Sequence, residues 1–125
     1  MRMNLIQGIG QIYIPVKELD RAITFYRDIL KLPLLFQAGT LAFFNCGGIR
    51  LMLSPPENED FATSSPILYL SVESIDDAYA QLKNVGVSFI DQPHLVAKMD
   101  TTETWMSFFR DSEHNLLALL CEKTT

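Results

Sequence analysis

Apolar and polar residues alternate in two stretches that hold equivalent places in the two halves of the chain. The first is QIYIPV at positions 11–16, and the second is ILYLSV at positions 67–72. A period of two residues predicts a β-strand in each. After each strand, apolar residues recur at helical spacing, which predicts an amphipathic helix. These residues are Leu19, Ile23, Tyr26 and Leu30 in the first half, and Ile75, Ala78, Tyr79 and Leu82 in the second.

The second predicted helix carries signals for both of its ends. Ser74 precedes the apolar stripe and is a plausible N-cap, with Asp77 three positions later as a loose capping box. Gly86 follows the stripe, where glycine commonly stops a helix.

Three apolar strands are expected after each helix, joined by polar turns. The segments CGG and DSEHN predict hairpin turns. The expected strands are LPLLFQ, LAFFNC and RLMLS in the first half, then FIDQPHLVAK, TWMSFF and LLALLCE in the second.

The two halves also align with each other, which indicates a duplicated module. GQIYIPVKELDRAITFY aligns without a gap with PILYLSVESIDDAYAQL, so that Tyr13 falls on Tyr69 and Asp20 on Asp76. The prediction is an α+β chain of tandem βαβββ modules, 1–56 and 65–125, joined by a linker at 57–64. A chain of 125 residues suits a single domain.

Composition narrows the function classes. The net charge of −5 argues against a nucleic-acid partner, because phosphate binding favours a cationic surface. We expect no membrane association, since no run of eighteen apolar residues occurs and the N-terminus lacks the pattern of a secretory signal. Cys46 and Cys121 lack metal-type spacing, and they predict reduced thiols in a cytoplasmic protein.

Two longer motifs, together with the order βαβββ–βαβββ, resemble the vicinal oxygen chelate superfamily of glyoxalase I, bleomycin-resistance proteins and extradiol dioxygenases. The motifs are DRAITFYRDIL and FFRDSEHNLLALL. The sequence departs from the family pattern at Lys31, and at Ser112, Glu113 and His114, where Gly, then Pro, Asp and Gly are usual. The resemblance implies a curved mixed sheet that forms a cup, with the helices on its outer face.

The resemblance also implies four metal-ligand positions. Gln11 stands where the family has His or Gln, Met52 and Ala118 stand where it has Glu, and Ile67 stands where it has His. Methyl-bearing side chains offer no lone pair, and a thioether suits Cu(I) better than Zn²⁺, Mg²⁺ or Fe²⁺. Catalytic zinc needs about three protein ligands. We therefore expect neither a metal nor another cofactor.

Alternation along the strands predicts a mostly apolar cup with a few polar groups, which resembles a small-molecule site. The cup could instead be filled by its own side chains or by a partner subunit. Its expected lining consists of Gln11, Tyr13, Arg50, Met52, Ile67, Tyr69, Leu116 and Ala118.

For each of three further side chains, the sequence allows two interpretations of its role. His94 could act as a general base oriented by nearby acids, or it could be an exposed strand histidine on one side with Val96 and Lys98. Trp105 could stack on a flat ligand at the cup rim or simply close a core. Arg50 could hold an anionic ligand or a carboxylate of the linker.

For two other residues, the sequence favours an interpretation without a functional role. His114 lies in the last turn and is read as a solvated loop residue. Cys46 has no neighbouring base in the sequence, and it is not expected to be a nucleophile.

The leading functional hypothesis is a metal-independent member of the superfamily that binds a small organic molecule. One alternative is a lyase, isomerase or dioxygenase that uses His94 and nearby acids. Another is a structural dimer without a ligand. A homodimer is expected in any case, because sheet edges and apolar rims favour pairing.

Overall fold

The computed structural model describes residues 9–56 and 67–124, which belong to two compact units, Met1–Thr63 and Ser64–Thr125. Each unit combines a sheet with helix, so the α+β prediction is confirmed. The predicted linker, 57–64, lies outside the described residues, and the single-domain organisation stays a prediction.

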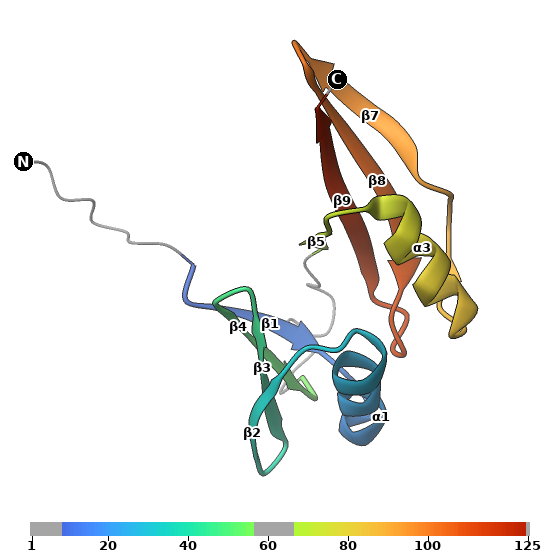
Figure 1. Ribbon diagram of the computed structural model, residues 1–125. Coiled ribbons are helices and arrows are strands. Elements are labelled where there is room, and N and C mark those ends of the chain that lie inside the picture. The colour runs from blue at the N-terminus through green and yellow to red at the C-terminus, as the bar shows by residue number, and fades with distance from the viewer. Residues whose placement is uncertain (1–8, 57–66, 125) are drawn as a thin grey trace, which may run out of the picture. The chain divides into compact units, whose positions relative to one another are not determined.

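The first unit has the predicted order βαβββ (Figure 1). Its strands form a sheet of order β1-β4-β3-β2, in which β1 runs parallel to β4 and the other pairs are antiparallel. Its elements are β1 (Gln11–Pro15), α1 (Leu19–Thr24), η1 (Phe25–Ile29), β2 (Leu34–Ala38), β3 (Leu41–Cys46) and β4 (Ile49–Ser54).

The helix of the first unit changes from α to π winding at Phe25, which changes the angular spacing of the residues that follow. The buried residues are Ala22, Ile23, Phe25 and Tyr26, whereas Leu19 and Leu30 of the predicted stripe are only half-buried. A strict 3.6-residue period cannot anticipate this, because a π turn inserts extra winding.

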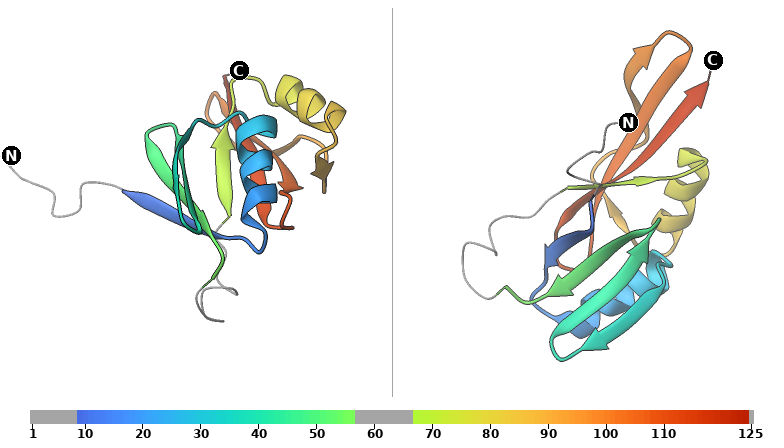
Figure 2. Two further views of the ribbon diagram at one scale, coloured as in Figure 1. Left: turned by 90° about the horizontal axis from the view of Figure 1, so that it is seen from below. Right: turned by 90° about the vertical axis from the view of Figure 1, so that its left-hand side faces the viewer.

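One face of the first sheet packs under α1 and η1 (Figure 2). The Tyr26 and Phe44 ring centroids lie 5.9 Å apart and join helix to sheet. Burial of this apolar face supplies the main driving force for folding the unit. Its fully or nearly fully buried strand residues are Ile14, Ala42, Phe44, Leu51 and Leu53.

The second unit repeats this plan with one strand more than predicted. The order of its sheet is β5-β9-β8-β6, with β7 also pairing with β8, and β5 runs parallel to β9. Its elements are β5 (Leu68–Ser71), α3 (Ile75–Asn84), β6 (Ser88–Phe89), β7 (His94–Met99), β8 (Thr102–Arg110) and β9 (Leu116–Thr124).

The single strand predicted over 89–98 was wrong, because pairing with β8 stops after Ile90, whose N–H donates to the Phe108 carbonyl at 2.8 Å, and resumes only at His94. Asp91 Oδ1 accepts the backbone N–H of Phe108 at 2.8 Å, and Ser107 Oγ donates to the Asp91 carbonyl at 2.9 Å. These bonds replace strand pairing here, and Pro93 has no N–H to offer a ladder.

The predicted ends of the second helix are confirmed. Ser74 Oγ accepts the backbone N–H of Asp77 at 3.3 Å, and Gly86 adopts φ +97° just after the helix. Glycine meets that positive φ without strain.

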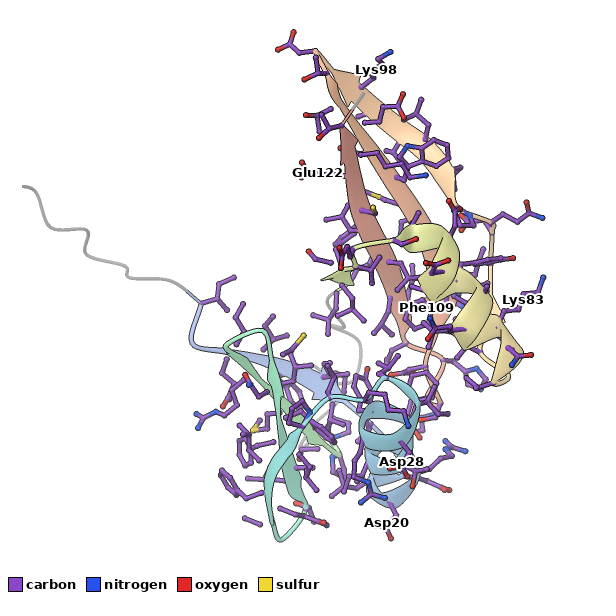
Figure 3. The ribbon with its side chains drawn as sticks, viewed as in Figure 1. Asp20, Asp28, Lys83, Lys98, Phe109 and Glu122 are labelled. Carbon is purple, nitrogen blue, oxygen red and sulfur yellow. The ribbon has the colours of Figure 1, made fainter. Side chains whose placement is uncertain are left out.

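The helix of the second unit packs on β8 and β9. Phe109, fully buried and labelled in Figure 3, lies 5.3 Å from Phe89, whose ring lies 4.6 Å from that of Tyr79 on α3. This aromatic chain fixes the helix against its sheet.

Two bulk predictions can be compared with the structure. No described helix is long and apolar enough to cross a membrane. Both cysteines are free, Cys121 buried and Cys46 half-buried. The cytoplasmic location stays a prediction.

Candidate functional site

The first sheet has a face that looks away from its helix, which we call open face 1. Strand register places Gln11 opposite Arg50, Tyr13 opposite Met52, and Met52 opposite Phe43. Directly paired residues project from the same side of a sheet. The residues of open face 1 include Gln11, Tyr13, Phe36, Phe43, Arg50 and Met52.

A polar chain runs across this face from β1 to β4. Arg50 Nε donates to Gln11 Oε1 at 2.9 Å, and Gln11 Nε2 lies 3.7 Å from Met52 Sδ. Gln11 and Arg50 are exposed, whereas Met52 is half-buried. The amide of Gln11 therefore holds one edge of the guanidinium while its other end rests on the thioether.

Two aromatic rings on β2 and β3 also belong to open face 1, although the lining predicted from the sequence included no residue of these two strands. The Phe36 and Phe43 rings stack with centroids 4.5 Å apart, and the Arg50 guanidinium lies 5.1 Å from the Phe43 centroid. Phe43 is 8% exposed, but Phe36 is 49% exposed. Sequence reasoning missed both. Alternation along LAFFNC indicated that Phe43 and Phe44 face opposite sides, but not which ring lies beside Arg50.

Tyr13 contributes its ring more than its hydroxyl. Its Oη donates to the Ser54 carbonyl at 3.2 Å, and the side chain is half-buried. The hydroxyl is therefore already engaged by the backbone of β4.

The corresponding surface of the second sheet, open face 2, is apolar. Register places Tyr69 opposite Ala118, and Ala118 opposite Phe108. The Tyr69 ring is 47% exposed and meets Phe108 edge-to-face at 6.1 Å, while Ala118 is fully buried beneath. Ile67, 42% exposed, directly precedes β5 and shares the side of Tyr69 by alternation. The two open faces lie in different units.

His94 belongs to open face 2, because it pairs with Met106. Its Nδ1 lies 2.9 Å from the Gln92 carbonyl and 3.9 Å from Asp91 Oδ2. Asp91 is thus a nearby acid that the structure brings close to His94.

The expected alternation beyond His94 was wrong. A register shift between Leu95 and Ala97 makes Val96 an extra residue, and Lys98 then pairs with Glu103. A β-bulge inverts the faces that follow it, so Lys98 lies on the opposite side of the sheet from His94.

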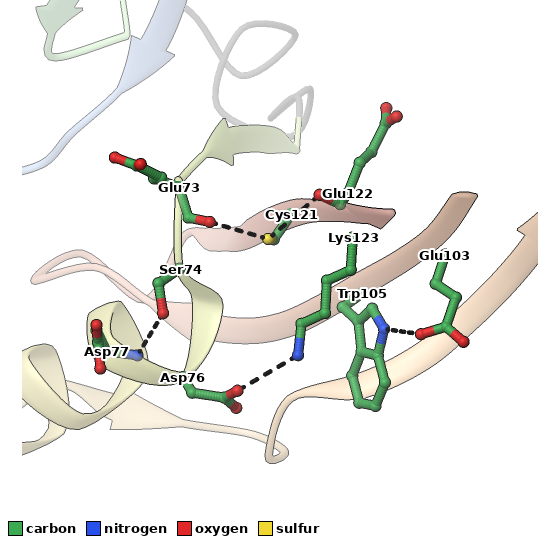
Figure 4. Close-up of polar contacts among 9 residues, drawn as sticks. All are labelled: Glu73, Ser74, Asp76, Asp77, Glu103, Trp105, Cys121, Glu122 and Lys123. Atoms are coloured by element: carbon green, nitrogen blue, oxygen red, sulfur yellow. Dashed lines mark hydrogen bonds and ion pairs between the residues drawn. The ribbon is translucent and has the colours of Figure 1, made fainter. Parts of the chain in front are cut away.

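Trp105 lies on the helix-bearing side of the second sheet and not on open face 2. It pairs with Cys121, one residue out of phase with Met106 and Phe108. Lys123 Nζ sits 4.3 Å from its ring centroid and 3.3 Å from Asp76 Oδ2, and Trp105 Nε1 donates to Glu103 at 3.0 Å (Figure 4). These contacts engage the indole N–H and the ring, and a ligand-stacking role for Trp105 stays a prediction.

The donor set at the family's metal positions does not fit a divalent cation. Gln11 directs its amide oxygen to Arg50, Met52 offers a thioether, and Ile67 and Ala118 offer no donor atom. Within residues 9–56 and 67–124, no group of three His, Cys, Asp or Glu side chains could hold a metal ion.

The half-buried Cys46 lies at the end of β3. Burial raises the pKa of its thiol. This disfavours the thiolate, so the environment does not activate Cys46 as a nucleophile. His114, with φ +66°, is exposed in the turn between β8 and β9, as its solvated reading predicts.

Comparison with known proteins gives consistent results. Residues 8–119 match the model of the glyoxalase/bleomycin resistance protein/dioxygenase superfamily. The chain is 43% identical over 92 residues to the metallothiol transferase FosB of Staphylococcus haemolyticus, a match that covers 70% of this chain and 66% of that protein. The chain thus spans slightly less than two thirds of the length of the FosB proteins that it matches.

Solved structures share the fold at low sequence identity. The antibiotic binding protein TnmS3 from Streptomyces sp. CB03234 has a TM-score of 0.78 and 21% identity, covering 97% of this chain and 100% of that one. Lactoylglutathione lyase from Agrobacterium tumefaciens has a TM-score of 0.77 and 17% identity, covering 94% and 96%. With the family model matching most of its length, the chain belongs to the glyoxalase/bleomycin resistance protein/dioxygenase superfamily.

Proposed function

We propose that this protein binds a small organic molecule without a metal ion, chiefly on open face 1. The observation that carries the proposal is the Gln11–Arg50 pair beside Met52 and the exposed Phe36 ring. A few polar groups within apolar and aromatic surface are typical of small-molecule sites. A methionine at a family carboxylate position extends the apolar surface and removes a metal ligand.

The names of the relatives suggest two directions. FosB is named a metallothiol transferase, and TnmS3 an antibiotic binding protein. A metal-dependent transfer needs donor atoms that Met52, Ile67 and Ala118 do not supply. Binding of an organic molecule needs no such donors, which makes it the better match for this chain.

The test is binding by metal-stripped protein. We expect purified protein to contain no stoichiometric Zn²⁺, Mn²⁺, Ni²⁺ or Fe²⁺ by elemental analysis. We also expect small aromatic compounds to bind in EDTA with an affinity that added Zn²⁺ does not change. Binding that appears only after a divalent metal is added would refute metal independence. A protein that binds no member of the panel would refute the binding role.

His94 supports a second candidate, an enzyme of the lyase, isomerase or dioxygenase type. An Nδ1–H bond to the Gln92 carbonyl would leave Nε2 as the acceptor, and Asp91 Oδ2 lies 3.9 Å from Nδ1. Replacing His94 by Gln should then abolish turnover of a substrate while leaving its binding intact. If His94→Gln leaves every detected activity unchanged, the enzymatic reading fails.

We also propose that the protein forms a homodimer. In the alternative without a ligand, this dimer would have a structural role only. Edge strands β2 and β7 carry exposed apolar side chains, including Leu35 and Phe36 on β2 and Leu95 and Val96 on β7. Such edges favour association. Sedimentation equilibrium at tens of micromolar should give twice the chain mass, and a monomer at that concentration would refute the proposal.

A further inference from the structure

Arg50 is an exposed cation that its described neighbours hold in place but do not neutralise. Within the described residues, it contacts the neutral amide of Gln11 and the ring of Phe43. Among residues 9–56 and 67–124, no carboxylate forms an ion pair with it. The contrast is Arg27, also exposed, whose guanidinium binds Asp28 through two bonds of 2.9 and 3.1 Å.

The bond to Gln11 determines which donors remain for a ligand. It uses Nε, and within the described part of the chain the two terminal nitrogens of the guanidinium have no hydrogen-bond partner. These nitrogens form a planar fork that matches the two oxygens of a carboxylate. Gln11 lies on β1, the parallel neighbour of β4, and pairs directly with Arg50. This pairing fixes the position of the guanidinium relative to β1.

The neighbouring apolar surface suits a flat ring. Phe36 is half-exposed while stacked on Phe43, so part of its ring remains open to a further aromatic group. Met52 pairs with Phe43 across the strands and adds a polarizable side chain to the same face. Cation and aromatic surface thus adjoin, since Phe43 contacts both Arg50 and Phe36.

From these contacts we infer that open face 1 selects a planar aromatic anion, with its carboxylate on Arg50 and its ring against Phe36 and Met52. This inference rests on the proposed function and assigns the chemical class of its ligand. Gln11 acts as a positioning residue for the guanidinium. Arg50 contributes charge and orientation, whereas Phe36 contributes apolar contact.

The experiment compares three probes of one shape and different charge by titration calorimetry in EDTA. The probes are 2-naphthoate, neutral 2-naphthylmethanol and cationic 2-naphthylmethylamine. We expect 2-naphthoate to bind about tenfold more tightly than the alcohol, the factor that one charge-assisted hydrogen bond supplies. The amine should bind more weakly than the alcohol.

Variants separate charge from ring contact. Arg50→Gln should remove the preference for 2-naphthoate, while Arg27→Gln, which deletes an equally exposed but paired cation, should leave it unchanged. Gln11→Leu should reduce the preference in part, because the guanidinium loses its anchor. Phe36→Ala, at a half-exposed position, should weaken binding of 2-naphthoate and 2-naphthylmethanol by the same factor.

The outcomes distinguish this inference from the proposed function. If 2-naphthoate and the alcohol bind equally, or Arg27→Gln acts as strongly as Arg50→Gln, the anion inference is overturned and metal-free binding stands. If none of the probes binds, both are overturned.

Discussion

Lys31 occupies a backbone conformation that suits glycine, so Lys31→Gly should stabilise the protein. Lys31 has φ +62° and follows Leu30, the C-cap residue of η1, at a position where the family motif usually has glycine. The turn is held by a bond of 3.0 Å from the Leu32 N–H to the Tyr26 carbonyl. The chain must therefore keep the left-handed conformation at this position whichever residue occupies it.

The magnitude follows from two opposing terms. A left-handed residue with a side chain costs about 1–2 kcal/mol. Glycine removes that strain, but it loosens the unfolded chain by about 0.4–1 kcal/mol. The net expectation is a gain of about 0.5–1 kcal/mol in the free energy of unfolding. With an m-value of about 2 kcal/mol/M, the urea midpoint should rise by about 0.3–0.5 M.

Urea unfolding followed by far-UV circular dichroism measures this shift, and two controls isolate its cause. Lys31→Ala removes the same charge but keeps a Cβ, so it should not reproduce the gain. Lys83→Gly makes the same chemical change inside α3, at an exposed position, and should cost about 1 kcal/mol. The reasoning fails if Lys31→Gly destabilises the protein or if Lys31→Ala stabilises it equally.

Three further predictions concern burial and capping. Ala118→Glu should destabilise the protein by roughly 3–5 kcal/mol in urea unfolding, because Ala118 is fully buried and the new carboxylate would lack a partner. Leu120→Glu, at a half-buried position of the same strand, is the control, and an equal loss of stability there would contradict this reasoning. Ser74→Ala should cost about 1 kcal/mol in the same assay through loss of the bond to the Asp77 N–H, while Ser74→Asp should retain stability, and equal losses would argue against capping. Cys46 should react with iodoacetamide more slowly at pH 8 than N-acetylcysteine and gain rate toward higher pH, because burial raises its pKa; a faster reaction in the folded protein would contradict this.

Local patterns determined much of the fold. Alternation in QIYIPV and the helical stripe around Ile75 predicted elements that the structure contains, and Ser74 and Gly86 marked helix ends correctly. These features depend on neighbours within a few residues, so the sequence alone carries them. The family motifs likewise depend on contiguous residues, so the sequence alone indicates the superfamily, which the match to the family model confirms.

Departures from regular winding and pairing required the tertiary structure. The π turn at Phe25 and the bulge at Val96 each shift the faces of the residues that follow them. Asp91 interrupts β-pairing because its side chain accepts a hydrogen bond from the Phe108 N–H, seventeen positions away in the sequence. Single-sequence periodicity assumes unbroken repetition, so it cannot locate such interruptions.

The candidate site likewise has features that the sequence determines and features that depend on the tertiary structure. The sequence by itself determined that Met52, Ile67 and Ala118 lack the donor atoms of a metal site, since ligand chemistry belongs to residue identity. Only strand pairing decided that Gln11 holds Arg50, that Phe43 and Phe36 lie beside them, and that Trp105 projects from the other side of its sheet. Such contacts join strands distant in sequence, and their register is fixed by the packing of the whole sheet.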